Sequence, residues 1–502
     1  MVENFERCYA AVQSRDPRFD GWFYTAVTST HIYCRPSCPA HTPLRRNVRF
    51  YPSAAAAQLA GFRACKRCRP DASPGSPEWN TRADVAARAM RLIADGVVDR
   101  EGVTGLASQL GYSVRQLERT LQSEIGAGPI AVARAQRAQT ARVLIETTAL
   151  PMTEVAFAAG FASVRQFNDT VQAVYASSPT TLRRTSRSHV ETSGAGATIV
   201  LRLPFRQPLC PDNLFGHLAA TAVPGVEEVW GNSYRRTVRL ARGPGIIELS
   251  YTPEYVLCRA TLSDLRDLTA AIARSRWLLD LDADPTAIDK HLAQDRGLRP
   301  LITKSPGRRV PRCVDAAEMA LRVVLGQQIS TSAARTHASR LVQEFGETVA
   351  DSGGGLTHLF PTPEALVDAT LAMPLQRRAT FTRLNAALVR GDLLLGPGCD
   401  RDTALEVMAQ LPGIGPWTQH VIAMRALGDS DAFPVTDLGV RRAAEALSFG
   451  ATPAALLERS RSWRPWRAYA VQYLWSVDDH DINHWPPRER IAVPKRQRKE
   501  TS

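Results

Sequence analysis

The pattern of apolar and polar positions divides the chain into long stretches with different expected secondary structure. Residues 82–184 have the pattern of helices almost throughout. Residues 198–263 contain short apolar runs with partial alternation, separated by turns such as Gly243-Pro-Gly, which predicts a small antiparallel sheet. Helical patterns resume near Ser263 and continue to about residue 485. No apolar run reaches the ~18 residues of a membrane span, so no membrane segment is expected.

Three joints separate these stretches. Residues 71–78 are rich in Pro, Gly and Ser, residues 185–197 form a linker of mostly small residues, and residues 296–301 are a softer boundary. We therefore expect domains at residues 1–75, 82–185, 197–297 and 298–490, followed by a basic tail at 491–502.

The helical stretch contains two similar copies of one short pattern, at residues 106–119 and 155–168. Glycine tolerates the positive φ that a tight turn needs, and serine caps the helix that follows. Each copy has these residues in order, as Gly111-Tyr112-Ser113 and as Gly160-Phe161 followed by Ser163. The copies predict two helix-turn-helix units, with a generic pair of helical hairpins as the alternative.

Composition and charge add an expected partner and compartment. The chain has 502 residues, too many for one ordinary core, and 44% are hydrophobic, enough to fill several cores. A net charge of +13 favours a polyanionic partner, nucleic acid first, over a merely basic surface. The nine cysteines do not suggest a secreted disulfide scaffold, and the first residues lack a signal-peptide pattern. A reduced cytoplasm is expected.

Four of the cysteines stand close together near the start of the chain. Cys34 and Cys38 form one pair and Cys65 and Cys68 another, with 26 residues between the pairs. Two close pairs separated by a loop match the spacing of a tetrahedral zinc site. Zinc keeps thiols in the thiolate form, which is the nucleophilic form. The site is therefore either a structural staple or a source of a reactive thiolate.

A second motif lies near the other end of the chain. Residues 411–417 read Leu-Pro-Gly-Ile-Gly-Pro-Trp between two predicted helices. Gly413 and Gly415 permit a sharp turn with open backbone amides, and Pro416 suits the first turn of a helix. Such amides can hold a DNA phosphate without reading sequence, as in a helix-hairpin-helix.

Asp437 follows this hairpin by twenty residues and precedes a helix predicted at residues 438–447. Taken alone, an aspartate at such a position is explained as a helix N-cap. The motifs around it favour a further role.

The first half of the chain resembles Ada-type regulators. Residues 23–38 and 62–70 resemble the N-terminal domain of the Ada adaptive-response protein, and residues 106–183 resemble the DNA-binding domain of AraC-type activators, including Ser178-Pro179 and Leu182-Arg183. The resemblance implies one Zn²⁺ per chain, on Cys34, Cys38, Cys65 and Cys68. It also implies that Cys34 accepts a methyl group from a DNA phosphotriester, and that RNA polymerase is a partner during activation.

Side chains in this half are expected to contact DNA. Arg35, Arg67 and Arg69 flank the cysteines and are expected at phosphates. The helices expected to read DNA carry Ser113, Arg115, Gln116, Ser163, Arg165 and Gln166.

The second half resembles the helix-hairpin-helix DNA glycosylases, and among them the AlkA-type 3-methyladenine DNA glycosylases. The resemblance rests on residues 411–437, on Leu325–Ser330, on residues 463–475 and on the sheet segment. It implies a catalytic Asp437 and a base pocket lined by Trp417 and Trp475, although tryptophans on helices are also common core residues.

Departures from related patterns refine this expectation. Lyase-active relatives have a lysine where this chain has Trp417, so a monofunctional hydrolase is expected. No four-cysteine cluster follows Arg441, so no iron–sulfur cluster is expected. Gln328 replaces the usual apolar wedge, and Val421 replaces a frequent pocket aromatic. No Pro-Cys-His-Arg motif occurs, so Ada's second alkyl-acceptor domain is absent.

The sequence therefore predicts a multidomain α+β protein. Its parts are a small four-cysteine zinc domain, an all-α double helix-turn-helix domain, a small antiparallel-sheet subdomain and an all-α helix-hairpin-helix glycosylase domain. The predicted function is an alkylation sensor and transcription activator fused to a glycosylase that removes alkylated bases from double-stranded DNA, in the bacterial cytoplasm and at the nucleoid. One alternative is a regulator whose glycosylase half only binds damaged DNA, and another is an enzyme whose helix-turn-helix segment is a non-specific clamp.

Overall fold

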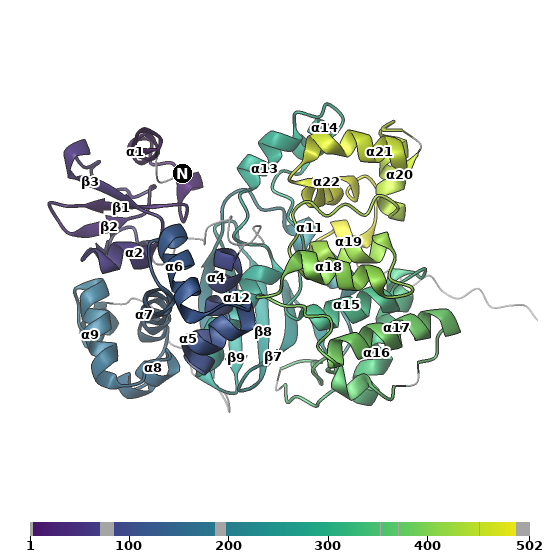
Figure 1. Cartoon of the computed structure of the whole chain (residues 1–502), viewed down its shortest axis with the longest axis horizontal. Helices are drawn as coiled ribbons and strands as arrows, with labels where there is room; N and C mark the ends of the chain where they lie inside the picture. Colours follow the sequence, from purple (N-terminus) through teal and green to yellow (C-terminus); the bar gives the residue numbers. More distant parts are fainter. Residues whose placement is uncertain are drawn as a thin grey trace, which may run out of the picture.

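The structure is a computed structural model of the whole chain, shown in Figure 1. It describes residues 4–70, 85–185, 197–351, 353–369, 371–450 and 452–487. The predicted linker at 71–78, the basic tail at 491–502 and residues 186–196 of the linker predicted at 185–197 lie outside these residues. Within the described residues, no helix is both long and apolar enough to cross a membrane.

The N-terminal module is built around a four-stranded sheet with the order β3-β1-β2-β4. Its helices are α1 (Phe5–Gln13) and α2 (Ala54–Leu59). Its strands are β1 (Tyr24–Val27), β2 (Ile32–Cys34), β3 (Val48–Tyr51) and β4 (Arg63–Ala64). The sequence pattern did not predict these strands, which are two to four residues long. Strands β2 and β4 are parallel, so their ends bring Cys34 and Cys65 to the same edge of the sheet.

The second module is all-helical, as predicted. Its helices are α4 (Val85–Ala94), α5 (Val97–Leu110), α6 (Val114–Ile125), α7 (Pro129–Thr147), α8 (Met152–Ala158), α9 (Val164–Tyr175) and α10 (Pro179–Thr185). Gly111 and Gly160 adopt φ angles of 77° and 86° at the two turns. Ser113 and Ser163 cap α6 and α9, each accepting a hydrogen bond from the backbone N–H three residues ahead. The two predicted turns thus have the expected backbone chemistry.

The third module contains the predicted antiparallel sheet, with the strand order β5-β9-β8-β7-β6. Its strands are β5 (Ala197–Pro204), β6 (Glu227–Trp230), β7 (Ser233–Leu240), β8 (Gly243–Tyr251) and β9 (Tyr255–Leu262). Two helices pack with this sheet, α11 (Pro211–Thr221) and α12 (Leu268–Leu278). Helix α11 and strand β6 were not predicted.

The remaining residues form the helical module at the right of Figure 1. Its helices are α13 (Pro285–Leu292), α14 (Arg299–Lys304), α15 (Ala316–Leu325), α16 (Thr331–Phe345), α17 (Leu375–Val389), α18 (Arg401–Gln410), α19 (Pro416–Arg425), α20 (Leu438–Ala446), α21 (Pro453–Ser460) and α22 (Arg467–Leu474). Helix α19 supplies Val421 and Ile422 to one buried cluster and Ala423 and Met424 to another. The hairpin before α19 therefore lies where two cores meet.

Side-chain contacts join the modules. Helix α4 is held to the C-terminal half of the chain by Arg88, which pairs with Asp400 at 3.1 Å. Asp95, directly after the helix, pairs with Arg274 at 2.9 Å. Arg206, after β5, donates a hydrogen bond to the backbone carbonyl of Asp20 in the N-terminal module. The described modules thus contact one another through specific polar groups.

Candidate functional site

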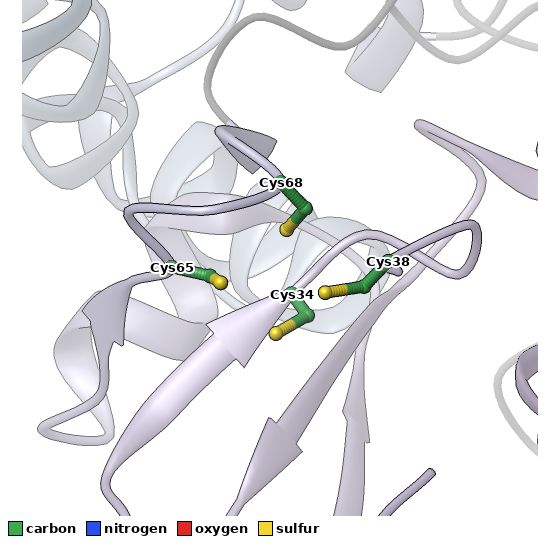
Figure 2. Close-up of side chains that lie close together, drawn as sticks. All are labelled: Cys34, Cys38, Cys65 and Cys68. Carbon is green, nitrogen blue, oxygen red and sulfur yellow. The ribbon is translucent and has the colours of Figure 1, made fainter. Parts of the chain in front are cut away.

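The four clustered cysteines converge on one point (Figure 2). Their sulfur atoms all lie within 4.8 Å of one another, and this is the only such group of potential metal ligands among the residues that the structure describes. Cys65 and Cys68 are buried, whereas Cys34 and Cys38 are partly exposed. The geometry suits a tetrahedral thiolate site, and its exposed side belongs to the first cysteine pair.

The loop between Cys34 and Cys38 is held by a buried carboxylate. Asp20 is 4% exposed and accepts hydrogen bonds from the backbone N–H and the hydroxyl of Ser37, at 3.0 and 2.6 Å. Burial raises the pKa of Asp20, and the bonds from Ser37 and the charge of Arg35 act in the opposite direction. Asp20 was not identified from the sequence, because the contact depends on a fold that the sequence pattern did not reveal.

The sulfur cluster needs positive charge if all four thiols are to ionise. The thiol of Cys38, followed by those of Cys65 and Cys68, holds the pKa of Cys34 well above its usual range. Four thiolates this close repel one another unless a cation lies between them. The donor set and spacing fit Zn²⁺, which would make Cys34 a thiolate.

The second site centres on Asp437, which caps α20. Its Oδ1 atom accepts a hydrogen bond from the backbone N–H of Val440 at 3.1 Å, so the simple structural role is present. The same carboxylate also accepts two indole N–H groups: Trp475 donates to Oδ1 and Trp417 to Oδ2, each at 2.9 Å. Among the described residues, no Lys, Arg or His forms an ion pair with it. Three neutral donors therefore orient a carboxylate that forms no ion pair within the described part of the chain.

Gly439 makes this arrangement possible. A Cβ atom at this position would lie 3.0 Å from Cδ1 of Trp475 and 3.3 Å from Oδ1 of Asp437. The glycine thus permits the close approach of indole and carboxylate. The sequence motif predicted Trp417 and Trp475 as pocket walls, but their hydrogen bonds to Asp437 and the role of Gly439 were missed.

The predicted hairpin connects α18 and α19 and packs closely on its surroundings. Gly413 adopts φ 93°, and a Cβ atom there would lie 1.9 Å from Oγ1 of Thr380. Gly415 is exposed and forms the N-cap of α19. The Gln327 amide donates to the carbonyl of Gly413 at 3.1 Å and to Oγ1 of Thr418 at 2.9 Å. These contacts of Gln327 were not predicted from the sequence, and they connect the α15–α16 loop to the hairpin.

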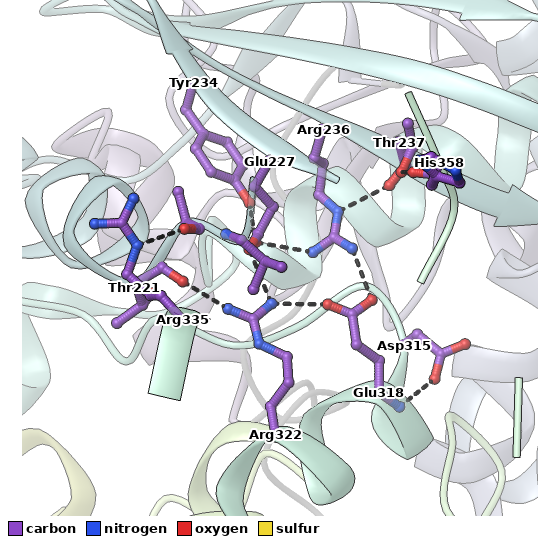
Figure 3. A network of polar contacts seen from close by, with 12 residues as sticks. Thr221, Glu227, Tyr234, Arg236, Thr237, Asp315, Glu318, Arg322, Arg335 and His358 are labelled. Atoms are coloured by element: carbon purple, nitrogen blue, oxygen red, sulfur yellow. Dashed lines mark hydrogen bonds and ion pairs between the residues drawn. The ribbon is translucent and has the colours of Figure 1, made fainter. Parts of the chain in front are cut away.

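A buried network of charges holds α15 against the sheet (Figure 3). Arg236 on β7 pairs with Glu318 at 2.8 Å, and Arg322 pairs with Glu318 at 2.8 Å and with Glu227 at 2.9 Å. Burial alone raises the pKa of Glu227, but Arg322 and Arg236 outweigh it and lower that pKa. Because buried charges are costly unless paired, this network fixes the position of α15 and of the loop that follows it.

Three family models match the chain. The metal binding domain of Ada matches residues 7–71, a helix-turn-helix domain matches residues 106–185, and the AlkA N-terminal domain matches residues 200–315. A Mycobacterium tuberculosis protein described as a probable bifunctional transcriptional activator/DNA repair enzyme AlkA is 58% identical over 496 residues, covering 98% of this chain and 100% of that protein. The chain belongs to the family of this bifunctional transcriptional activator/DNA repair enzyme.

Two further relatives each match one part of the chain. DNA-3-methyladenine glycosylase 2 of Escherichia coli is 30% identical, over 55% of this chain and 95% of that protein. The bifunctional transcriptional activator/DNA repair enzyme Ada of Escherichia coli is 39% identical, over 27% of this chain and 36% of that protein. The predicted fusion of an Ada-type sensor to an AlkA-type glycosylase is confirmed, as are the α+β fold class and DNA as partner.

The residues expected to contact DNA differ in exposure and in the partners that they already have. Arg115, Gln116, Arg165 and Gln166 are exposed on α6 and α9. Oε1 of Gln116 already accepts a hydrogen bond from Ser113, and Oε1 of Gln166 accepts one from the backbone N–H of Ala162 at 3.4 Å. Arg165 lies 4.0 Å from Asp169. In the N-terminal module, Arg67 is exposed. Arg35 pairs with Asp20 at 3.4 Å, and Arg69 pairs with Glu146 on α7. Their DNA contacts stay predictions.

The two departures from the glycosylase pattern also have definite positions in this family member. Gln328 is exposed in the middle of the α15–α16 loop and has a positive φ of 59°. Val421 is 7% exposed and belongs to the core around α15. A polar side chain thus occupies the expected wedge position, and Val421 fills core space.

Proposed function

We propose that Cys34 senses DNA alkylation by taking a methyl group from a methylphosphotriester. The sulfur of its thiolate attacks the methyl carbon, a new S–C bond forms, and the C–O bond to the phosphotriester breaks. The electron pair leaves with oxygen, which restores an ordinary phosphodiester anion. Zn²⁺, one per chain, would be held by Cys34, Cys38, Cys65 and Cys68 and would supply the thiolate character of the acceptor.

Methyl transfer would also change the charge of the sensor. Four thiolates around Zn²⁺ carry a formal charge of −2, and conversion of one to a neutral thioether leaves −1. Repulsion from DNA phosphates falls accordingly, by ~1 kcal/mol where solvent is partly excluded. Operator binding through α6 and α9 would tighten, and the bound activator would recruit RNA polymerase.

The second activity would be hydrolysis of the N-glycosidic bond of an alkylated base such as 3-methyladenine. The base is flipped out of the duplex, and its cationic ring suits the aromatic faces of Trp417 and Trp475. The Asp437 carboxylate stabilises positive charge that develops on the sugar or positions the attacking water. Gly413 and Gly415 hold the DNA backbone. The position of Trp417, where a lyase would carry lysine, supports monofunctional hydrolysis.

The proposal for the glycosylase rests on the two indole N–H groups, of Trp417 and Trp475, that orient the carboxylate of Asp437. The test is release of free methylated base from alkylated DNA, with Asp437→Asn as the matched variant. Asparagine can still cap α20, so the variant should bind DNA and release no base. If the unmodified protein and the variant both release base, Asp437 is not a catalytic residue. If neither releases base, the alternative of a regulator that only binds damaged DNA is favoured.

The activator role needs a separate test. Operator affinity should be compared for unmethylated protein and for protein methylated at Cys34, at one fixed salt concentration. Tighter binding after methylation supports the switch, and equal affinities contradict it. Footprinting on the protein's own promoter distinguishes an activator from the alternative of an enzyme with a non-specific clamp.

The metal content and location complete the proposal. Metal analysis should find one equivalent of zinc and no iron, in keeping with the expectation of no iron–sulfur cluster. The cytoplasmic, nucleoid-associated location follows from DNA as the partner, and imaging of a fluorescent fusion would test it.

A further inference from the structure

Helix α11 of the sheet subdomain contacts the last helix of the glycosylase module at two points. The Asn213 amide donates to Oε1 of Gln472 at 3.2 Å, and the His217 ring is stacked on Trp475, with centroids 6.0 Å apart and planes 24° from parallel. Asn213 and His217 are one turn apart on α11, and Gln472 and Trp475 are three residues apart. One face of α11 therefore meets the C-terminal end of α22.

Helix α11 is itself fixed on its other sides. Oδ1 of Asn213 accepts the backbone N–H of Arg309 at 2.7 Å, so the amide is committed in both directions. A Cβ atom at Gly216 would lie 2.8 Å from the backbone of His484, which shows how closely the C-terminal segment packs on this helix. The helix has little freedom to slide relative to Trp475.

The His217 ring is neutral and contacts Trp475 through its face. Burial lowers the pKa of His217 well below its ordinary value, and the positive charges of Arg425, His480 and Arg322 add to the effect. Its Nε2 atom is buried without a hydrogen-bond partner. A flat, uncharged ring in this position restricts the tilt of the indole, whose N–H lies 2.9 Å from the carboxylate of Asp437.

We propose that His217 is a positioning residue for the glycosylase: it acts through Trp475, holding the indole N–H on Asp437. This inference rests on the proposed catalytic role of Asp437. It gives the sheet subdomain a part in the reaction, because α11 supports the catalytic carboxylate from behind the indole. This role could not be predicted from the sequence, because α11 itself was not predicted.

The consequence is a change in the chemical step rather than in DNA binding. If Trp475 tilts away, the Asp437 carboxylate loses one of the two indole donors that orient it, so base release from bound DNA should slow. The hairpin that is proposed to hold the DNA backbone is separate from the contact between His217 and Trp475, so DNA affinity should stay the same.

The experiment measures single-turnover base release at saturating alkylated DNA, and DNA affinity, with the full-length protein. Trp475→Phe, which keeps a ring and loses the N–H, should slow release by about 10-fold or more. His217→Ala should also slow release and leave DNA affinity unchanged. His217→Phe keeps a flat ring and should recover most of the rate, whereas His217→Gln keeps polarity without a ring and should not.

Leu218→Ala is the matched control, because Leu218 is on the same helix but packs in the core of the sheet. This variant should lower stability and leave the single-turnover rate unchanged. An unchanged rate in His217→Ala, or an equal loss of rate in Leu218→Ala, overturns the inference. Activity of Asp437→Asn would instead overturn the proposed function, so the two failures are distinguishable.

Discussion

At the scale of single residues, Asp437 combines two roles that sequence reasoning treats as alternatives. It caps α20 and presents a carboxylate held by two indoles. The motif around the residue predicted its importance from the sequence. The partners could not be predicted, because Trp417, Asp437 and Trp475 lie on three separate elements whose packing brings them together.

Substitution of Asp437 should separate these roles. Asp437→Ala removes both the cap and the carboxylate, and loss of a cap costs about 1 kcal/mol. Asp437→Asn retains the cap. Both variants should lack base release, but only the alanine variant should have a lower melting temperature. Equal melting temperatures would show that the cap contributes nothing measurable.

Gly439→Ala should reduce activity without unfolding the protein. The added methyl group would press on Trp475 and on the carboxylate, while alanine is otherwise favourable within a helix. We expect base release to slow by about 10-fold or more, because small displacements of catalytic groups are costly. Rates on alkylated DNA would check this.

Gly128→Ala serves as the control for that measurement. A Cβ atom at Gly128 has nothing within 4 Å, and the residue is the N-cap of α7 in the second, all-helical module. Its base release should match that of the unmodified protein. A similar loss in both variants would mean that the effect has no connection with Trp475.

At the scale of secondary structure, the pattern of apolar positions predicted the long elements and missed those with unusual burial. Helix α11 was missed because Asn213 and His217, both polar, are among its buried residues. Strand β6 was missed because its alternation is inverted: Glu227 is buried and Trp230 is 53% exposed. The strands near the cysteines are too short for any periodicity to show.

The buried imidazole on α11 should make stability depend on pH. Above about pH 6.5 neither the folded nor the unfolded state protonates His217. Below it the unfolded chain binds a proton that the folded site disfavours, so the free energy of unfolding falls by ~1.4 kcal/mol per pH unit. Stability is thus lost as pH falls.

His217→Phe should weaken this dependence. The drop in melting temperature between pH 7.5 and pH 5.5 should be smaller in the variant than in the unmodified protein. Some dependence will remain, since burial also lowers the pKa of His420. An unchanged drop would mean that His217 accepts its proton in the folded state.

At the scale of the whole molecule, the order of modules was predictable from motifs, whereas their contacts were not. The ion pairs of Arg88 with Asp400 and of Asp95 with Arg274 join residues that are far apart in the chain. Nothing in the local pattern of either segment marks these partners.

The modules should nevertheless fail separately. Cys65→Ser should unfold the N-terminal module, because metal binding supplies much of the stability of such a small domain. The Asp437 site draws its side chains from α19, α20 and α22, so base release should stay within about twofold while methyl transfer disappears. Zinc content, methyl transfer and base release measured on one preparation would check this. Parallel loss of both activities would show that the glycosylase depends on the sensor.

The partly exposed Cys34, one per chain and joined to a catalyst, has a consequence for how the cell records damage. On the proposed function, the cysteine is used once and the carboxylate is used repeatedly. The methylated fraction of the protein therefore counts past exposure, whereas the glycosylase capacity is unaffected by that count. Each molecule records a single methyl transfer, and this record is lost only by dilution at cell division or by degradation of the protein. The duration of the response is then set by growth rate and protein turnover.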